Sequence, residues 1–315
     1  MSVPDFEPML ATRWPDAFDG PSWWFEVKWD GYRAVVSADG GRVRARSRRG
    51  LDLTGPFPEL SGLPIPDGIA VDGEIVAFDE SGRPSFSNLQ RRTGFGGRGT
   101  GAEVGVNLIV FDVLYASGER LIGLPYEERR ARLEALDLPR PIVVPEPMPE
   151  HGVTLFEVAK AQGLEGIVGK RSGSQYLPGR RSPDWRKVAV TRQLRAIVGG
   201  YLPGEGGRAS TFGSILVGLS DEQGLRWIGA VGSGFDEAAL NAFSGALRQM
   251  ERPTSPFYNQ VILPKPTKPV WVAPRIVVDV EYKEWTHDHH LRAPVYKGIE
   301  MADPETVTWA EEGPV

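Results

Sequence analysis

Cysteine is absent from this chain of 315 residues. Its absence excludes disulfide bonds, thiolate catalysis and cysteine-based zinc sites, and it is compatible with a reducing compartment. Long hydrophobic runs are also missing, since the longest, around LIVFDVLY, is far too short to span a bilayer. The N-terminus carries acidic residues and no apolar stretch, so it predicts no signal peptide. We therefore expect a globular, cytoplasmic protein with no membrane partner.

An excess of positive charge is lacking as well, because the net charge is −5. This balance argues mildly against a nucleic-acid partner, but the distribution of charge matters more than its sum. Four arginines recur with period two in GRVRARSRRG: Arg42, Arg44, Arg46 and Arg48. On a strand they would share one face, with no carboxylate interleaved. We interpret this face as binding an anion, and a solvated strand face is the alternative.

Glycine and proline, in contrast, are abundant, with 38 and 27 residues, and they divide the chain into many short elements. Alternating apolar residues predict several strands within residues 24–78 and a buried strand over Asn107–Tyr115. A helix is expected over Pro125–Leu136. Thr154 and Glu157 have the spacing of a capping box, which would open a further helix. These elements predict an α+β domain over residues 1–190.

The stretch Phe86–Gly101 is expected to begin as a short helix and to continue as a glycine-rich loop. Its glycines do not follow an apolar strand and open a helix, which excludes a dinucleotide or phosphate-loop interpretation. We expect a mobile surface loop in which Arg91, Arg92 and Arg98 are free to meet a phosphate.

The character of the chain changes near Val190. Residues 194–232 predict strands joined by glycine turns, and Asp236 caps a helix. A proline-rich connection from Pro253 to Pro274 leads to further strands. Five or so strands with one intervening helix suit a small OB-type barrel, over residues 191–315.

The stretch FEVKWDGYR, residues 25–33, combines an apolar face with an unusual polar face. On a strand, successive side chains point in opposite directions. The apolar set is Phe25, Val27 and Trp29, and the charged set is Glu26, Lys28 and Asp30. Gly31 then permits a turn or a close approach to a ligand, and Arg33 adds a fixed cation. A lysine between two carboxylates is a candidate functional group, with a solvated edge strand as the alternative.

Four later stretches carry functional residue types on one face or at the ends of predicted strands. They are VDGEIVAFD with Asp72 and Glu74, LIVFDVLY with Phe111 and Asp112 at its end, EGIVGKR with Glu165, Lys170 and Arg171, and YLPGRRSPDWRKVAV with Arg180, Arg181, Arg186 and Lys187 around Trp185. Each alone is equally an ordinary turn carboxylate, core aromatic or solvated basic run. Their order along the chain, together with Lys28, is the informative feature.

In this order the motifs resemble those of the covalent nucleotidyltransferases: ATP-dependent DNA ligases and, more distantly, RNA ligases and mRNA-capping enzymes. The chain is most similar to small bacterial ATP-dependent DNA ligases and to the ligase module of bacterial end-joining ligases. The resemblance runs from PMLAT near the N-terminus to EWTHDHHLRAP near the C-terminus. The KxDGxR motif alone is moderately specific, whereas six motifs in order are highly specific.

The resemblance implies a role for each matching residue. Lys28 matches the nucleophile that forms a covalent lysyl-AMP with ATP. The nucleotide-binding positions are Glu26 and Phe111 at the adenine, Arg33 and Arg48 at the ribose and the nick ends, Glu74 near the ribose and the metal, and Lys187 at the α-phosphate. An ammonium group cannot attack phosphorus, and neighbouring cations such as Lys187 and a bound metal favour the neutral amine.

The resemblance also implies Mg²⁺ or Mn²⁺ as a cofactor beside ATP. The expected metal ligands are Asp30, Glu74 and Glu165, carboxylates that a bound metal would neutralise. The expected DNA-binding residues are all arginines: Arg42, Arg44, Arg46, Arg49, Arg180, Arg181 and Arg292. The expected partner is nicked duplex DNA, with other DNA-repair proteins directing the chain to it.

Three departures from the family pattern concern the use of ATP more than the adenylyl site. Ala189 stands where a second lysine often follows in the WxKxK motif, and Arg49 replaces asparagine in the SRNG motif. The stretch Glu300–Asp303 stands where a basic motif orients the pyrophosphate during self-adenylylation.

We therefore expect an α+β chain with an antiparallel-sheet nucleotidyltransferase (adenylation) domain, residues 1–190, and an OB-fold β-barrel domain, residues 191–315. The resemblance implies a monomeric DNA ligase, associated with the nucleoid, that seals nicks in DNA repair through lysyl-AMP and an adenylylated 5′-phosphate. One alternative is an RNA ligase or capping-type nucleotidyltransferase. Another is a nick-binding protein with weakened self-adenylylation.

Overall fold

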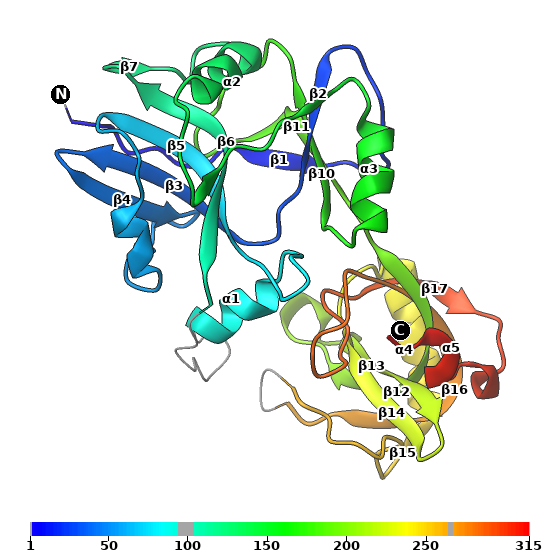
Figure 1. Ribbon diagram of the computed structural model, residues 1–315. Coiled ribbons are helices and arrows are strands. Elements are labelled where there is room, and N and C mark those ends of the chain that lie inside the picture. Colours follow the sequence, from blue (N-terminus) through cyan, green and yellow to red (C-terminus); the bar gives the residue numbers. More distant parts are fainter. Residues whose placement is uncertain (1, 94–103, 264–266, 315) are drawn as a thin grey trace. The chain divides into compact units, whose positions relative to one another are not determined.

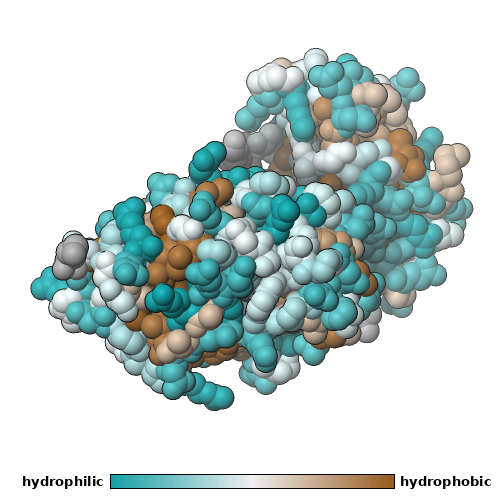
Figure 2. Space-filling view, turned by 90° about the horizontal axis from the view of Figure 1, so that it is seen from above, coloured by the Kyte–Doolittle hydropathy of each residue, from teal (hydrophilic) through white to brown (hydrophobic). Residues whose placement is uncertain are grey.

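The computed structural model describes residues 2–93, 104–263 and 267–314 (Figure 1). The chain divides into two compact units, Met1–Val190 and Thr191–Val315. Of the stretch predicted over Phe86–Gly101, the structure describes the helix, Phe86–Thr93. The glycine-rich loop that was predicted to follow, including Arg98, lies outside the described residues. Within those ranges, no helix is long and apolar enough to cross a membrane. Hydrophilic side chains cover most of the face seen in Figure 2, with smaller hydrophobic areas between them.

The first unit contains two sheets, and the larger one carries most of its core. Its strand order is β4-β3-β5-β6-β7, with β8 paired to β6. The strands are β3 (Tyr32–Asp39), β4 (Arg42–Ser47), β5 (Ile69–Ala77), β6 (Val106–Ala116), β7 (Glu119–Arg120) and β8 (Ile142–Val143). The buried strand predicted over Asn107–Tyr115 is confirmed, because β6 is almost entirely buried. A short 3₁₀ turn, η1 (Pro58–Gly62), follows β4 and buries Leu60.

The second sheet of this unit has the order β1-β11-β10-β2-β9. Its strands are β1 (Leu10–Arg13), β2 (Trp23–Val27), β9 (Met148–Pro149), β10 (Gly166–Arg171) and β11 (Arg181–Ala189). Pairing is antiparallel except between β1 and β11. The sheet therefore brings the stretches FEVKWDGYR, EGIVGKR and PDWRKVA side by side, although they are far apart in the sequence.

Three helices complete the unit: α1 (Phe86–Thr93), α2 (Tyr126–Glu134) and α3 (Gly152–Ala161). The predicted capping box is wrong, because α3 begins at Gly152 and Thr154 lies inside its first turn. Asp19 provides the cap instead, accepting a hydrogen bond from the backbone N–H of Val153 at 2.9 Å. A partner 134 residues away satisfies that N–H, so local spacing did not reveal it.

The arginine-rich strand departs from the prediction in two ways. β4 ends at Ser47, so Arg48 lies on the following turn and not on the strand face. Carboxylates do accompany the cations: Arg46 lies 3.1 Å from Asp5, and Arg44 lies 3.9 Å from Asp39. Both carboxylates come from outside the strand, so its own sequence did not reveal them, and anion binding by this face stays a prediction.

The arginines of α1 are also engaged. Both Nη atoms of Arg92 donate to the carboxylate of Glu59, at 2.5 and 2.6 Å. Arg91 donates to the side-chain oxygen of Asn88, one turn earlier on the helix. The prediction that Arg91 and Arg92 are free to meet a phosphate is wrong for the structure as it stands.

The second unit is one antiparallel sheet with a helix against it. The strand order is β14-β13-β12-β16-β15, and β17 pairs with β16. The strands are β12 (Arg192–Pro203), β13 (Phe212–Asp221), β14 (Gly224–Val231), β15 (Glu251–Arg252), β16 (Val270–Tyr282) and β17 (Val295–Glu300). The helices are α4 (Glu237–Gln249), the short α5 (Trp309–Glu312) and the 3₁₀ turns η2 (Gly206–Arg208) and η3 (Pro304–Thr306).

The predicted cap of α4 is confirmed, because the side chain of Asp236 accepts from the N–H of Ala239 at 2.7 Å. Leu240, Phe243 and Leu247 of this helix are buried in the core of the unit. Pro274 belongs to β16 and not to the connection before it. It lies where the register between β12 and β16 shifts, a position at which a strand tolerates the missing N–H of proline.

Candidate active site

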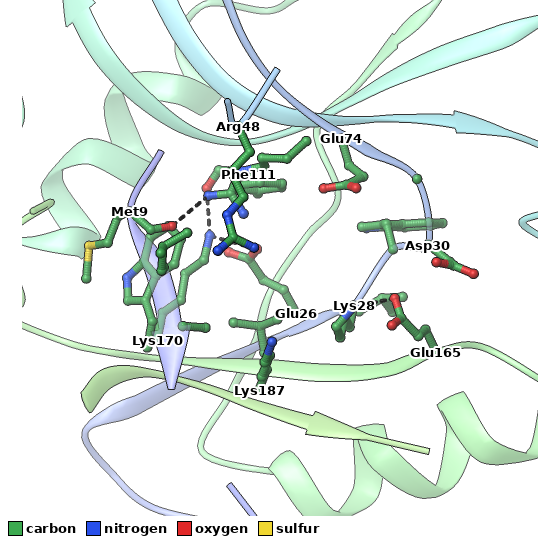
Figure 3. Close-up of a pocket in the computed structure, with 18 of the residues that line it drawn as sticks. Met9, Glu26, Lys28, Asp30, Arg48, Glu74, Phe111, Glu165, Lys170 and Lys187 are labelled. Atoms are coloured by element: carbon green, nitrogen blue, oxygen red, sulfur yellow. Dashed lines mark hydrogen bonds and ion pairs between the residues drawn. The ribbon is translucent and has the colours of Figure 1, made fainter. Parts of the chain in front are cut away.

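One pocket of the first unit collects the residues predicted to bind nucleotide and metal (Figure 3). Its lining includes Glu26, Lys28, Asp30, Arg33, Arg48, Glu74, Phe111, Glu165 and Lys187. These side chains come from strands of both sheets, from the link between β2 and β3, and, for Arg48 and Glu165, from positions next to β4 and β10. The eight predicted nucleotide- and metal-binding positions and the predicted nucleophile Lys28 therefore line a single pocket, although their individual roles stay predictions.

Lys28 is the first residue of the link between the two sheets. β2 ends at Val27 and β3 begins at Tyr32, so the alternation predicted through Asp30 stops before Lys28. Trp29 is half-buried and not part of a core cluster. The backbone N–H of Lys28 donates to the carbonyl of Gly166 at 2.8 Å, and its ammonium forms an ion pair with Glu165. The strand ending at Val27 thus places the lysine where the chain crosses between the sheets.

Gly31 allows this link to pass directly against β5. A Cβ atom at Gly31 would lie 2.2 Å from the carbonyl oxygen of Ile75 and 2.9 Å from Cγ of Glu74. Backbone cannot move aside as a flexible side chain can, so any larger residue displaces the link or the strand. Gly31 therefore sets how closely the link that carries Lys28 approaches β5 at Glu74 and Ile75.

Substituting Gly31→Ala is expected to lower covalent labelling by α-labelled ATP about 100-fold, since misplacing a reacting group by about 1 Å costs that much. Gly55→Ala is the matched control, because a Cβ there meets nothing within 4 Å and should leave labelling unchanged. Comparable labelling rates for the two variants would show that the close approach at Ile75 does not position Lys28.

Arg33 is fixed by Asp72, a residue with no predicted role. Nε and Nη2 of Arg33 each donate to one carboxylate oxygen of Asp72, both at 2.6 Å. Burial opposes the charge of Arg33, but the attraction and hydrogen bonds of Asp72 outweigh it and raise the pKa of Arg33. The hydroxyl of Tyr176 donates to the same carboxylate, and the guanidinium lies 4.5 Å from the centre of the Phe111 ring. The cation is held rigidly at the edge of the pocket.

Glu74 lies in the same pocket with less compensation for its charge. Burial raises the pKa of Glu74 to about 8, against the attraction of Arg33 and Lys28 and together with the repulsion of Glu165 and Asp72. Arg33 is the main charge that offsets this rise, although its guanidinium is held in a bidentate pair by Asp72. At neutral pH the carboxyl is largely protonated unless a further cation enters the pocket.

This shift gives a pH dependence with a definite sign. Between the ordinary pKa of 4.5 and about 8, the folded protein holds a proton on Glu74 that the unfolded chain has lost. Stability therefore falls as pH rises through this window.

Glu74→Gln should reduce the loss of folding stability between pH 5 and pH 8 by about 2 kcal/mol, after discounting for partial solvent access. Urea unfolding at both pH values measures it. Glu119→Gln, on exposed β7, should keep the wild-type profile, and an E74Q profile parallel to wild type would contradict the assignment.

Glu26 is buried and was predicted to face the adenine. Its Oε2 accepts a hydrogen bond from Nζ of Lys170 at 2.8 Å, and its Oε1 accepts one from the hydroxyl of Tyr126. Sequence reasoning assigned no role to Lys170 or Tyr126. Tyr126 lies 100 residues from Glu26, and nothing in its local sequence points to this contact.

The basic residues of the first unit divide between several places. Lys187 and Arg181 of β11 and Arg48 line the pocket. Arg186 does not, and its guanidinium lies 3.8 Å from the centre of the Trp14 ring. Arg180 is exposed.

The remaining arginines predicted to bind DNA are not among the residues that line the pocket. Arg46 and Arg49 line a separate hollow beside the N-terminal segment, and Arg42 is exposed on β4. In the second unit, Arg292 forms an ion pair with Glu284.

The surroundings of Phe111 differ from the prediction in one respect. Trp185 is 1% exposed and packs against Phe111 and Tyr176. Phe111 and Asp112 lie inside β6 and not at its end. Asp112 forms a fully buried ion pair with Arg129, which makes it a structural residue.

No group of three or more histidine, aspartate or glutamate side chains in the described ranges is arranged to hold a metal ion. Asp30, Glu74 and Glu165 nevertheless line one pocket, and carboxylate oxygens are the donors that Mg²⁺ and Mn²⁺ prefer. The raised pKa of Glu74 indicates a carboxyl whose ionisation requires more positive charge nearby. In its chemistry, the donor set fits a divalent cation.

Comparison with known families decides the assignment. The ATP dependent DNA ligase domain matches residues 8–189, and the ATP dependent DNA ligase C terminal region matches residues 208–301. This chain belongs to the ATP-dependent DNA ligase family. The ligase fold is an adenylation domain followed by an OB-fold domain, and the predicted fold class is confirmed.

The ligase resembles one group of relatives in particular. It is 36% identical over 310 residues to the multifunctional non-homologous end joining protein LigD of Mycolicibacterium smegmatis, covering 97% of this chain and 40% of that protein. The LigD protein of Pseudomonas aeruginosa is 35% identical, with 90% and 34% covered. A solved structure of mycobacterial DNA ligase D complexed with ATP and MES has 34% identity and a TM-score of 0.57, covering 96% of this chain and 98% of that one. The ligase thus spans 40% or less of these two curated relatives.

Proposed function

We propose that this ligase seals nicks in duplex DNA through a lysyl-AMP intermediate, in bacterial end-joining repair. The observation that carries the proposal is the position of Lys28, at the crossing between two sheets and in one pocket with Lys187, Arg33 and Glu74. The end-joining role is drawn from the names of the LigD relatives, and ATP from the family and the ATP complex. We propose that the ligase acts as a monomer in the cytoplasm, brought to DNA breaks by other repair proteins.

The chemistry begins at the ion pair between Lys28 and Glu165. The amine of Lys28 has to lose its proton before it attacks the α-phosphorus of ATP, and the bond to the leaving pyrophosphate then breaks. Lys187 and Arg33 supply fixed positive charge in the pocket, which favours both the neutral amine and the developing phosphate charge. A divalent cation held by Asp30, Glu74 and Glu165 would neutralise these carboxylates and assist the departure of pyrophosphate.

The later steps transfer the AMP. It passes from Lys28 to the 5′-phosphate of a nick, and the 3′-hydroxyl then displaces it and joins the strand. Phosphate contacts fall to the arginines: Arg42, Arg44, Arg46, Arg49, Arg180, Arg181 and Arg292. The pairs of Arg44 and Arg46 with carboxylates are surface pairs, worth about 0–1 kcal/mol, so DNA phosphates can replace them.

The test is covalent labelling followed by transfer. The ligase is incubated with α-labelled ATP and Mg²⁺ or Mn²⁺ and is expected to become labelled; added nicked DNA should then remove the label and be sealed. Nicked RNA in a parallel reaction tests the RNA-ligase alternative. A wild-type ligase that takes no label but seals pre-adenylylated nicks would mean that the first step is disabled.

The altered C-terminal motif, Glu300–Asp303, ends at a helix cap. The side chain of Asp303 caps η3 and accepts a hydrogen bond from the backbone N–H of Glu305.

A further inference from the structure

Lys170 is a buried cation that touches both groups predicted to meet the adenine. It lies on β10 and is 1% exposed. Its Nζ donates to Oε2 of Glu26 at 2.8 Å and to the backbone carbonyl of Phe111 at 2.9 Å. The ammonium also lies 4.6 Å from the centre of the Phe111 ring. In Figure 3 its side chain extends toward Glu26 and Phe111.

The contact with Phe111 depends on an irregularity of β6. Asp72 pairs with Asp112 and Gly73 pairs with Val110, so Phe111 is the extra residue of a β-bulge. A bulge leaves one residue unpaired in the ladder and re-aims its side chain. The carbonyl oxygen of Phe111 accepts a hydrogen bond from Nζ of Lys170, a residue of the other sheet. One hydrogen bond therefore ties the orientation of the bulge, and of the aromatic ring on it, to β10.

The carboxylate of Glu26 is held at both oxygens. Lys170 donates to Oε2 and Tyr126 donates to Oε1, and all three residues are buried. The remaining lone pairs can only accept hydrogen bonds, because an ionised carboxylate has no proton to donate. An amino group on a base matches this arrangement. A base with a carbonyl group at the same position would place its oxygen against the carboxylate of Glu26, and two acceptors facing each other are unfavourable.

We propose that Lys170 is a positioning residue for base selection, which sets Glu26 as an acceptor for the 6-amino group of adenine and orients the Phe111 ring as the face for the base. The inference rests on the proposed function, in which Glu26 and Phe111 contact the adenine of ATP. It predicts that the pocket binds 6-aminopurine triphosphates in preference to 6-oxopurine triphosphates. It also assigns the selectivity to a residue that acts through its contacts with Glu26 and Phe111.

The experiment compares covalent labelling by α-labelled ATP and α-labelled inosine triphosphate, which carries a 6-oxo group. In Lys170→Met, Oε2 of Glu26 and the carbonyl of Phe111 both lose the donor that holds them, so the acceptor and the ring are no longer fixed against the base. The ratio of the second-order labelling rates, ATP over inosine triphosphate, is expected to fall at least 10-fold. In a Glu26→Gln background the ratio should fall no further when Lys170→Met is added, because both act through one carboxylate.

Lys160→Met is the control, since Lys160 is exposed on α3 and should leave the ratio unchanged. An equal loss of rate with both nucleotides in Lys170→Met, with the ratio kept, would overturn the proposal, because a purely structural lysine behaves in that way. Should Lys170→Met not fold, Tyr126→Phe decides by the same criterion: a ratio lowered at least 3-fold supports the proposal, and an unchanged ratio overturns it. A wild-type ligase that neither nucleotide labels and that also seals no pre-adenylylated nick refutes the proposed function instead.

Discussion

Ligase carrying Lys28→Ala is expected to take up no label from α-labelled ATP, at least 10⁴-fold less than wild type. The alanine has no nucleophile to form the phosphorus–nitrogen bond, and removing a nucleophile costs factors of this size. Among the described residues that line the pocket, the other lysines are Lys170 and Lys187. Lys170 is bound to Glu26 and Phe111, so it is not placed to substitute.

Two further measurements make this result specific. Lys160→Ala, at an exposed lysine of the same unit, should label at the wild-type rate. The Lys28→Ala variant should still seal a nick that already carries AMP on its 5′-phosphate, because the final step needs no lysine nucleophile. Undiminished label in the alanine variant would refute the assignment of Lys28. Loss of both labelling and sealing would point to a general defect of the pocket.

The site was predictable because the residues that line the pocket also belong to motifs that resemble those of the family. Lys28, Glu74, Phe111, Glu165 and Lys187 lie far apart in the sequence, yet each sits in a short motif that resembles one of the family. The pocket brings all five together. Local patterns did not reveal which groups each charged side chain contacts, or the exact element on which it lies. Lys28 was predicted on a strand and lies on a link, because β2 ends one residue before it.

The residues that support the site were not predictable in the same way. Tyr126, Lys170 and Asp72 act through partners that are between 39 and 144 positions away, so no window of the sequence contains both members of a contact. The cap of α3 failed as a prediction for the same reason, since Asp19 is distant in sequence. Spacing rules describe what a residue can do locally, whereas buried polar groups are satisfied by whichever partner the tertiary fold supplies.

Asp112 is a buried polar group of this kind, and its substitution is expected to have the largest effect on stability. Both Asp112 and Arg129 are fully buried, and the guanidinium donates to the carboxylate at 2.8 and 3.0 Å. Asp112→Ala leaves a buried cation without its counter-charge, which costs about 3–5 kcal/mol. Urea unfolding at pH 7 measures the loss. Arg44→Ala removes an exposed pair and should change stability by less than about 1 kcal/mol.

The double variant Asp112→Leu with Arg129→Met separates the value of the pair from the cost of breaking it. Replacing both members of a buried pair by apolar residues is often close to neutral, so most of the stability should return. The return should be incomplete, because Arg129 also donates to the carbonyls of Leu124 and Ser174 at 2.7 and 2.9 Å, and both lose that partner. A double variant no more stable than Asp112→Ala would mean that these carbonyl contacts, and not the ion pair, hold α2 against β6.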